Sequence, residues 1–207
     1  MDKEWVDKYL KVLTLQMERV RRIKWALFEP TPSFYEKLES GDDNDLEEAA
    51  TAIGRHMELS VIPSITYEWG LKMKPEAAGQ IRYMGSLRSQ IQIPLFYVGK
   101  PLALGAILAH ELTHEFLFSK GIMCTSEDEL EQLTDLTSIA VGLGKLVLNG
   151  TFTEMVPSMG EGHTLGYLSP DLKAYAAKQV NQQHAIPNAN AMEYLTENAL
   201  RLLKTFT

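Results

Sequence analysis

The chain has 207 residues, of which 45% are hydrophobic and 23% charged, and it carries a formal net charge of −7. This composition is typical of a folded globular protein and argues against disorder. The acidic balance provides no electrostatic basis for binding nucleic acid, and we expect no such partner.

Cysteine usage and hydropathy indicate the compartment. The single cysteine, Cys124, excludes an internal disulfide and fits a reducing environment. The first ten residues lack the apolar core of a signal peptide. The longest apolar runs, near residues 102–109 and 139–148, are too short to span a bilayer. We therefore expect a cytoplasmic protein that does not associate with a membrane.

The first part of the chain is predicted to be helical. Apolar residues recur at a helical period over residues 2–28, and Pro30 ends this expected helix. A polar turn then precedes a second helix that runs to about Leu59. In that helix Asp45 and Glu48 have the spacing of a capping box.

A small sheet is expected before the middle of the chain. Three segments have strand composition, namely residues 64–69, 81–84 and 89–98. The last two flank Gly85, which predicts a hairpin. The sequence therefore predicts a small antiparallel sheet.

The rest of the chain is predicted to be helical, with helices over about 101–120, 126–148, 169–186 and 189–204. Gly121 is expected to end the first of these in a left-handed conformation, and Ser126 to cap the second. We predict a compact α+β fold in one domain, residues 1–207. Its expected parts are N-terminal helices (1–60), the sheet and central helices (61–150) and C-terminal helices (151–207).

The sequence HELTH, residues 110–114, lies in the first of these later helices. Residues four apart share one face of a helix, so His110 and His114 can both present a ring nitrogen to one ion. Glu111 borders the same face and is placed to accept a proton from a water that a metal activates. The pattern therefore predicts a zinc site with Glu111 as the catalytic base.

The helix that carries HELTH favours this interpretation over a chance occurrence. Residues 101–118 are apolar nearly all round the helix, which predicts that it is buried. Buried charged groups must be paired or bound to a metal. The alternative is a pair of hydrogen-bonded histidines in the core, and we favour the metal.

A third ligand is expected from the next helix. Glu131 and Asp135 are four residues apart beside apolar positions, so Glu131 can ligate zinc and Asp135 can accept the other N–H of a zinc histidine. The acidic residues at 127–129 also compete for this role. They lie in the first helical turn, where acidic side chains stabilise the helix dipole, and this explains them sufficiently.

HELTH followed by EQLTD resembles the HExxH and ExxxD motifs of the gluzincin, or thermolysin-like, zinc metallopeptidases. The resemblance covers about residues 85–150. It implies a zincin-like domain with zinc held by His110, His114 and Glu131, with Glu111 activating water and Asp135 supporting a histidine. The run ELTDL…GLG…GYLS also resembles an uncharacterised bacterial family of HExxH proteins.

The chain departs from the gluzincins in two respects. It is much shorter, so a full second domain for binding substrate is missing. No residue matches the tyrosine or histidine that gluzincins use against the developing oxyanion. His163 and Tyr167 are candidates by type alone. The alternatives are an exposed loop position for His163 and an anchor at the start of the following helix for Tyr167.

The expected function is zinc-dependent hydrolysis of a peptide or protein substrate. An edge strand within 89–98 is expected to pair with the extended substrate. A second interpretation is a metal-binding regulator or interaction protein that keeps a zincin fold without turnover. A third is a helical protein in which HELTH is coincidental and no metal binds.

Overall fold

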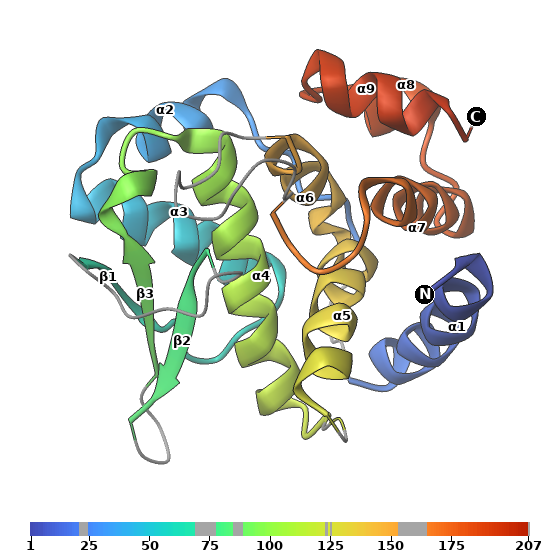
Figure 1. The fold of residues 1–207 in the computed structure, drawn as a ribbon, viewed down its shortest axis with the longest axis horizontal. Coiled ribbons are helices and arrows are strands. Elements are labelled where there is room, and N and C mark those ends of the chain that lie inside the picture. Colours follow the sequence, from blue (N-terminus) through green and yellow to red (C-terminus); the bar gives the residue numbers. More distant parts are fainter. Residues whose placement is uncertain are drawn as a thin grey trace.

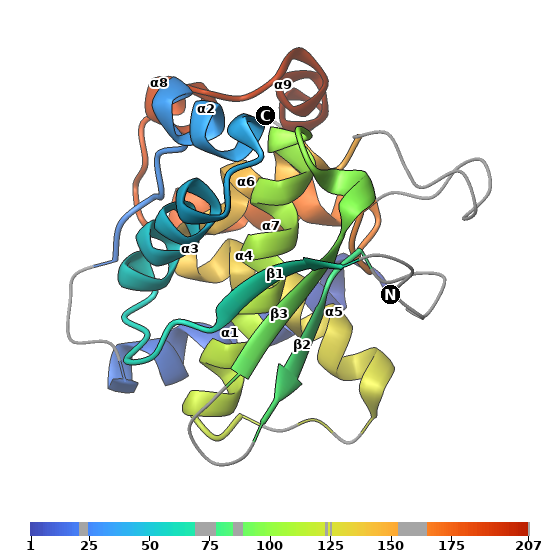
Figure 2. The same ribbon diagram turned by 90° about the vertical axis from the view of Figure 1, so that its left-hand side faces the viewer.

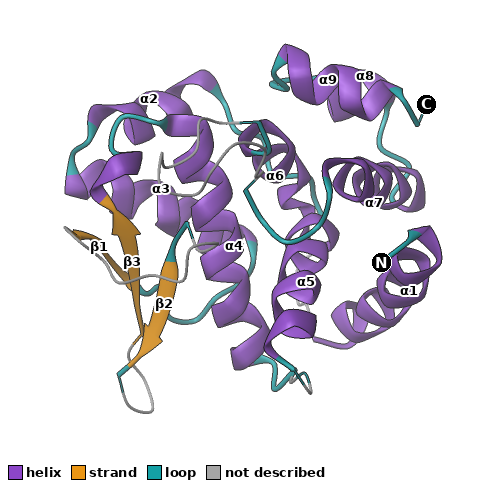
Figure 3. Cartoon of the chain, in the orientation of Figure 1, coloured by secondary structure: helices purple, strands orange, loops and turns teal. Residues whose placement is uncertain are grey.

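The computed structural model is an α+β protein, as the sequence predicts, with its helices and its one small sheet segregated from each other (Figure 3). It describes residues 1–20, 25–68, 78–84, 89–122, 124, 126–152 and 165–206, with the side chains of 18–20 left aside.

The elements follow in chain order. The first half contains α1 (Lys3–Val20), α2 (Pro32–Ser40), α3 (Asp43–His56), β1 (Ser64–Glu68), β2 (Gln80–Tyr83), β3 (Ser89–Pro94) and a 3₁₀ turn (Leu95–Tyr97). The second half contains α4 (Pro101–Ser119), α5 (Glu127–Ser138), a π-helical segment η2 (Ile139–Leu143), α6 (Gly144–Gly150), α7 (Pro170–Gln183), α8 (Asn188–Met192) and α9 (Glu197–Lys204).

The sheet is mixed, and the expectation of a purely antiparallel sheet is wrong. Its strand order is β1-β3-β2, with β3 parallel to β1 and antiparallel to β2 (Figure 2). The predicted β2–β3 pairing is therefore confirmed, whereas Gly85 lies outside the described residues. Because β3 is the central strand, it is paired on both sides, and β2 lies at an edge.

Helix α4 runs through the middle of the molecule, between the sheet and the pair α5–α6 (Figure 1). Leu104, Leu108 and Leu112 on α4 are 0% exposed, as the apolar sequence predicts. The helix begins at Pro101 and is followed by Gly121, which has the expected left-handed φ of 67°. The N-terminal helix α1 packs against α7 on the far side of α5. None of the helices described here is long and apolar enough to cross a membrane.

The N-terminal helix is shorter than predicted. It ends at Val20 within the described residues, and the expected helical residues 25–28 have no helical structure. A tertiary hydrogen bond replaces a helical one at Phe28, whose N–H donates to the Gly142 carbonyl at 3.0 Å, and the Trp25 indole N–H also donates to the Ala140 carbonyl at 2.8 Å. The helix α2 was not predicted. It begins at Pro32, and its N-cap Thr31 accepts from the Phe34 N–H.

The next helix, α3, differs from the prediction at both ends. Its N-cap is Asp42, which accepts from the N–H groups of Asn44 and Asp45, so the predicted capping box at Asp45 is wrong. The helix ends at His56, three residues before the predicted end at Leu59.

A π-helical segment interrupts the helix predicted over 126–148. Ser126 caps α5 as expected, since its hydroxyl accepts from the Glu129 N–H, but the helical geometry breaks at Gly142, which has φ 101°. This break frees carbonyls for other partners. The Gly142 carbonyl accepts from the Phe28 N–H at 3.0 Å, and the Val141 carbonyl lies 3.0 Å from His56 Nε2.

Gly142→Ala is expected to lower the free energy of unfolding by about 2–4 kcal/mol, because its φ is left-handed and an added Cβ would lie 2.3 Å from the Ala26 carbonyl oxygen. Gly144→Ala is the matched control. There a Cβ would meet only Ile139 and Ala177, at 3.6 and 3.7 Å, so this change should be neutral or stabilising. Urea unfolding measures the free energy of unfolding of both variants. Equal losses in the two would contradict the requirement for glycine at position 142.

The C-terminal helix is divided, and the single helix predicted over 189–204 is wrong. Ser169 caps α7 as expected. The chain then forms α8 and α9, with Thr196 as the N-cap of the latter. Asn149 of α6 stabilises the non-helical turn between α8 and α9. Its side-chain Nδ2 donates to the Tyr194 carbonyl at 2.8 Å, and its Oδ1 accepts from the Thr196 N–H at 2.9 Å.

Candidate metal centre

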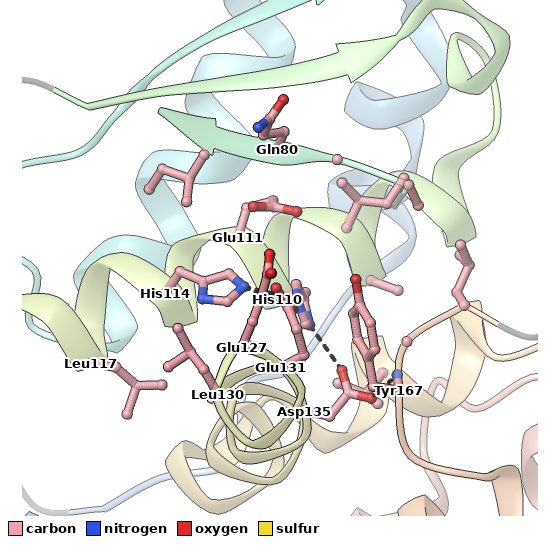
Figure 4. A pocket seen from close by; sticks show the side chains of 18 of the residues that line it. Gln80, His110, Glu111, His114, Leu117, Glu127, Leu130, Glu131, Asp135 and Tyr167 are labelled. Atoms are coloured by element: carbon pink, nitrogen blue, oxygen red, sulfur yellow. Dashed lines mark hydrogen bonds and ion pairs between the residues drawn. The ribbon is translucent and has the colours of Figure 1, made fainter. Parts of the chain in front are cut away.

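Helices α4 and α5 bring three of the predicted site residues to one point. His110 and His114 lie one turn apart on the side of α4 that faces α5, and Glu131 reaches them from α5 (Figure 4). The Nε2 atoms of the two histidines are 3.1 Å apart. Glu131 Oε2 lies 2.9 Å from the first and 3.2 Å from the second. These are the three ligands that the sequence analysis expected, with Glu131 favoured over the acidic residues at 127–129.

The partner of His110 fixes which of its ring nitrogens carries the proton. Its Nδ1 lies 2.9 Å from Asp135 Oδ1. An ionised carboxylate only accepts, so Nδ1 carries a hydrogen, and in the neutral ring Nε2 then presents a lone pair to the triad.

His114 is oriented by a threonine. Its Nδ1 lies 3.3 Å from Thr134 Oγ1, whose hydroxyl already donates to the Leu130 carbonyl at 2.8 Å. The threonine oxygen is therefore left to accept from Nδ1–H, and Nε2 of His114 presents its lone pair as well. Thr134 was not predicted as a site residue, although it follows Glu131 by three positions on the same helix face.

When both rings are neutral, three lone pairs converge here, and a positive charge stabilises them, whether a metal ion or a proton on a histidine Nε2 that donates to Glu131. Donors in a tetrahedral zinc site with bonds of about 2.0–2.1 Å lie about 3.3 Å apart, close to the separations seen here. The residues present thus fit a metal ion, held by His110, His114 and Glu131.

The pKa values of His110 and Glu131 also show that this site stabilises positive charge. Burial by itself would lower the pKa of His110, but hydrogen bonds to Asp135 and Glu131 outweigh it and raise this pKa to about 10. Burial by itself would raise the pKa of Glu131, but hydrogen bonds from the two histidines outweigh it and lower this pKa to about 2.

Glu111 lies beside the triad, between α4 and β2 (Figure 4). It is 5% exposed, and the backbone N–H of Ile81 donates to its carboxylate. Burial raises the pKa of Glu111, and the neighbouring histidines oppose this shift. Gly79 allows the close approach, since a Cβ there would lie 2.9 Å from Glu111 Oε1. The structure thus places the predicted base next to the site, with its proton affinity increased.

Asp135 is buried and supported from the segment before α7. Its Oδ2 accepts from the N–H groups of Tyr167 and Leu168, at 2.6 and 2.8 Å. This requires Gly166, whose φ is 87° and whose Cβ, if present, would lie 2.6 Å from the same oxygen. Burial by itself would raise the pKa of Asp135, but Lys173 and His110 outweigh it and lower this pKa, so the carboxylate is ionised.

Lys173 is a buried cation that the sequence analysis missed. It is 1% exposed, and its Nζ donates to the Leu165 carbonyl and lies 3.9 Å from Asp135 Oδ2. Burial lowers the pKa of Lys173, and Asp135 opposes this shift. A signal was available in the sequence, because Lys173 falls on the same helical face as the buried Ala176 and Ala177.

Of the two candidates for stabilising the oxyanion, the structure describes only Tyr167. The Tyr167 ring stacks on His110 with centroids 5.7 Å apart, so its ring lies in the site while its N–H anchors Asp135. His163 lies outside the described residues.

The site opens into a cleft of about 780 Å³, within the range of ligand-binding pockets. Its walls come from α4, α5, β2 and the segment before α7. No family model, curated protein or solved structure matches the chain.

Proposed function

We propose that the protein is a zinc-dependent hydrolase that cleaves peptide bonds. The observation that carries this proposal is the convergence of two histidine lone pairs and a carboxylate oxygen at an open cleft, with a buried glutamate beside them. A site with two histidines and one glutamate favours zinc over harder cations. Zinc bound there would polarise the scissile carbonyl and lower the pKa of a water toward neutrality.

The protein's own groups would then move the proton. The Glu111 carboxylate accepts a proton from the attacking water as the new C–O bond forms and the carbonyl oxygen becomes an oxyanion. It then passes this proton to the amide nitrogen, and the C–N bond breaks as the carbonyl re-forms and the amine leaves. Burial suits Glu111 to this role, because it raises its pKa toward the working pH. Tyr167, whose ring stacks on His110, is the candidate for stabilising the oxyanion.

The substrate strand would pair with β2. The expectation that a strand within 89–98 pairs with substrate is wrong for β3, because β3 is central in the sheet. Since the Ile81 N–H points to Glu111, Ile81 and Tyr83 turn their backbone groups away from β3 and toward the cleft. The Ile81 N–H is taken by Glu111, but an extended peptide can pair with the Ile81 carbonyl and the Tyr83 backbone groups, which would bring one of its peptide bonds beside Glu111.

Metal analysis and cleavage assays test the proposal together. We expect about one zinc per chain in the purified protein, and none in the His110→Ala/His114→Ala variant. Incubation with a mixed peptide library should give products by mass spectrometry, and chelation should abolish them. A chain that binds no zinc overturns the proposal. Zinc without cleavage of any peptide overturns the enzymatic part and supports a metal-binding regulator instead.

A further inference from the structure

The two histidines of the metal triad meet different kinds of acceptor at their other ring nitrogen. His110 Nδ1 lies 2.9 Å from the carboxylate of Asp135, and His114 Nδ1 lies 3.3 Å from the hydroxyl oxygen of Thr134. Hydrogen bonds to a charged acceptor are shorter and about twice as strong as those to a neutral one. The position of the ring hydrogen is therefore firmly set in His110, whereas in His114 it depends on a weaker contact.

His114 has a second acceptor within reach, on the side that would face a metal. Its Nε2 lies 3.2 Å from Glu131 Oε2. A neutral imidazole carries one hydrogen, and the acceptors around the ring decide which nitrogen carries it. A hydrogen on Nε2 would donate to Glu131 and occupy the lone pair that a metal needs. Thr134 and Glu131 thus compete for this hydrogen, and only the bond to Thr134 leaves Nε2 open.

Burial makes this competition matter for metal binding. The side chain of His114 is 11% exposed, and Thr134 is 0% exposed. Once Nε2 of a neutral ring binds a metal, the ring hydrogen must lie on Nδ1. A buried N–H without an acceptor is costly, and the metal-free chain can avoid that cost by moving the hydrogen to Nε2. The hydroxyl of Thr134 is therefore needed specifically in the metal-bound state.

We infer that Thr134 is a positioning residue for metal binding, whose hydroxyl oxygen holds the ring hydrogen of His114 on Nδ1 and keeps Nε2 available as a ligand. This inference rests on the metal-binding part of the proposed function, and it adds a residue outside the ligand triad on which the metal affinity depends. Loss of the hydroxyl is expected to weaken zinc binding by about 10–100-fold, the usual effect of removing the partner of a metal-bound histidine.

The experiment compares full-length Thr134→Val and Thr134→Ser proteins with the unchanged chain. Valine has nearly the shape of threonine without its hydroxyl, whereas serine retains the hydroxyl. Chelator competition should show the loss of about 10–100-fold in zinc affinity for Thr134→Val, and a change of at most about threefold for Thr134→Ser. In the zinc-loaded proteins, NMR of the histidine rings should show a His114 Nδ1–H that exchanges slowly with water, except in Thr134→Val, where it should exchange rapidly.

Thr113→Val is the matched control. Thr113 on α4 is also 0% exposed, and its hydroxyl donates to the Ala109 carbonyl as that of Thr134 does to the Leu130 carbonyl. It is absent from the lining of the cleft, so its substitution should leave zinc affinity and hydrogen exchange unchanged.

Equal zinc affinities in the two valine variants, or a slowly exchanging His114 Nδ1–H in Thr134→Val, overturn the inference and leave the proposed function standing. The expected differences without cleavage of any peptide support the inference and overturn the enzymatic proposal. A chain that binds no zinc overturns both.

Discussion

Glu111→Gln is expected to lower kcat/KM for peptide hydrolysis by about 10²–10⁴-fold, the usual contribution of a general base. Glutamine has the same shape as glutamate but cannot accept the proton of the attacking water. Its amide oxygen can still accept the hydrogen bond from the Ile81 N–H. The loss should therefore come from proton transfer rather than from a rearranged site.

Two further readouts separate this effect from damage to the fold. Zinc content should stay at about one per chain, because Glu111 does not belong to the ligand triad. Thermal stability should be equal or higher, because a buried carboxylate that costs desolvation is removed. Unchanged hydrolysis would sink the assignment of Glu111 as the base.

Glu115→Gln is the control on the same helix. Glu115 accepts a hydrogen bond from Ser89 at 2.8 Å and does not belong to the metal triad. The substitution removes the same charge one turn further along α4, and kcat/KM should stay within about threefold of the unchanged protein. A large loss in both variants would point to the overall charge of α4 rather than to a base.

Lys173→Met is expected to weaken zinc binding by about 10–100-fold, the usual effect of losing a residue that supports a metal ligand. Lys173 holds the Leu165 carbonyl and offsets the charge of Asp135, which in turn orients His110. Without the ammonium group, the segment before α7 is less firmly held against Asp135. Competition with a chelator of known affinity measures the dissociation constant for zinc.

Lys145→Met provides the control for burial of a lysine. Lys145 on α6 is 2% exposed and pairs with Glu29, away from the metal triad. Lys173→Met is expected to lower the free energy of unfolding by about 3 kcal/mol, since it leaves the buried Asp135 uncompensated. Lys145→Met should cost less, because its partner Glu29 is 38% exposed and water can solvate it. Only Lys173→Met should change zinc affinity. Equal zinc affinities in the two variants would show that Lys173 is a structural residue alone.

The sequence is most informative where the signals are local. Ser126 and Gly121 mark helix ends through chemistry that acts within one turn, and both expectations are confirmed. The two histidines are similar, because their spacing of four residues puts them on one face of α4, whereas Glu131 was chosen from its depth in the next helix.

Features that depend on distant parts of the chain were not predictable in this way. The direction of β1 against β3 depends on how the chain returns between them, and alternation of apolar residues is the same for either direction. Residues 25–28 of the helix expected over 2–28 are not helical, and there Trp25 and Phe28 bond to carbonyls far along the chain. Lys173 was missed since a lysine in a helix is usually solvated, and only α7 packing buries it.

The π-helical break between α5 and α6 joins the N-terminal part of the chain to η2 by hydrogen bonds. The successive carbonyls of residues 140–142 take hydrogen-bond partners from three separate places, the Trp25 indole, the His56 ring and the Phe28 N–H. Removing the chain before α3 would leave two of these carbonyls without those donors inside the core, and buried orphan acceptors are costly. Trp25 and Phe28 therefore complete the backbone hydrogen bonds of η2, the segment that directly follows the helix carrying Glu131, and their removal is expected to destabilise it.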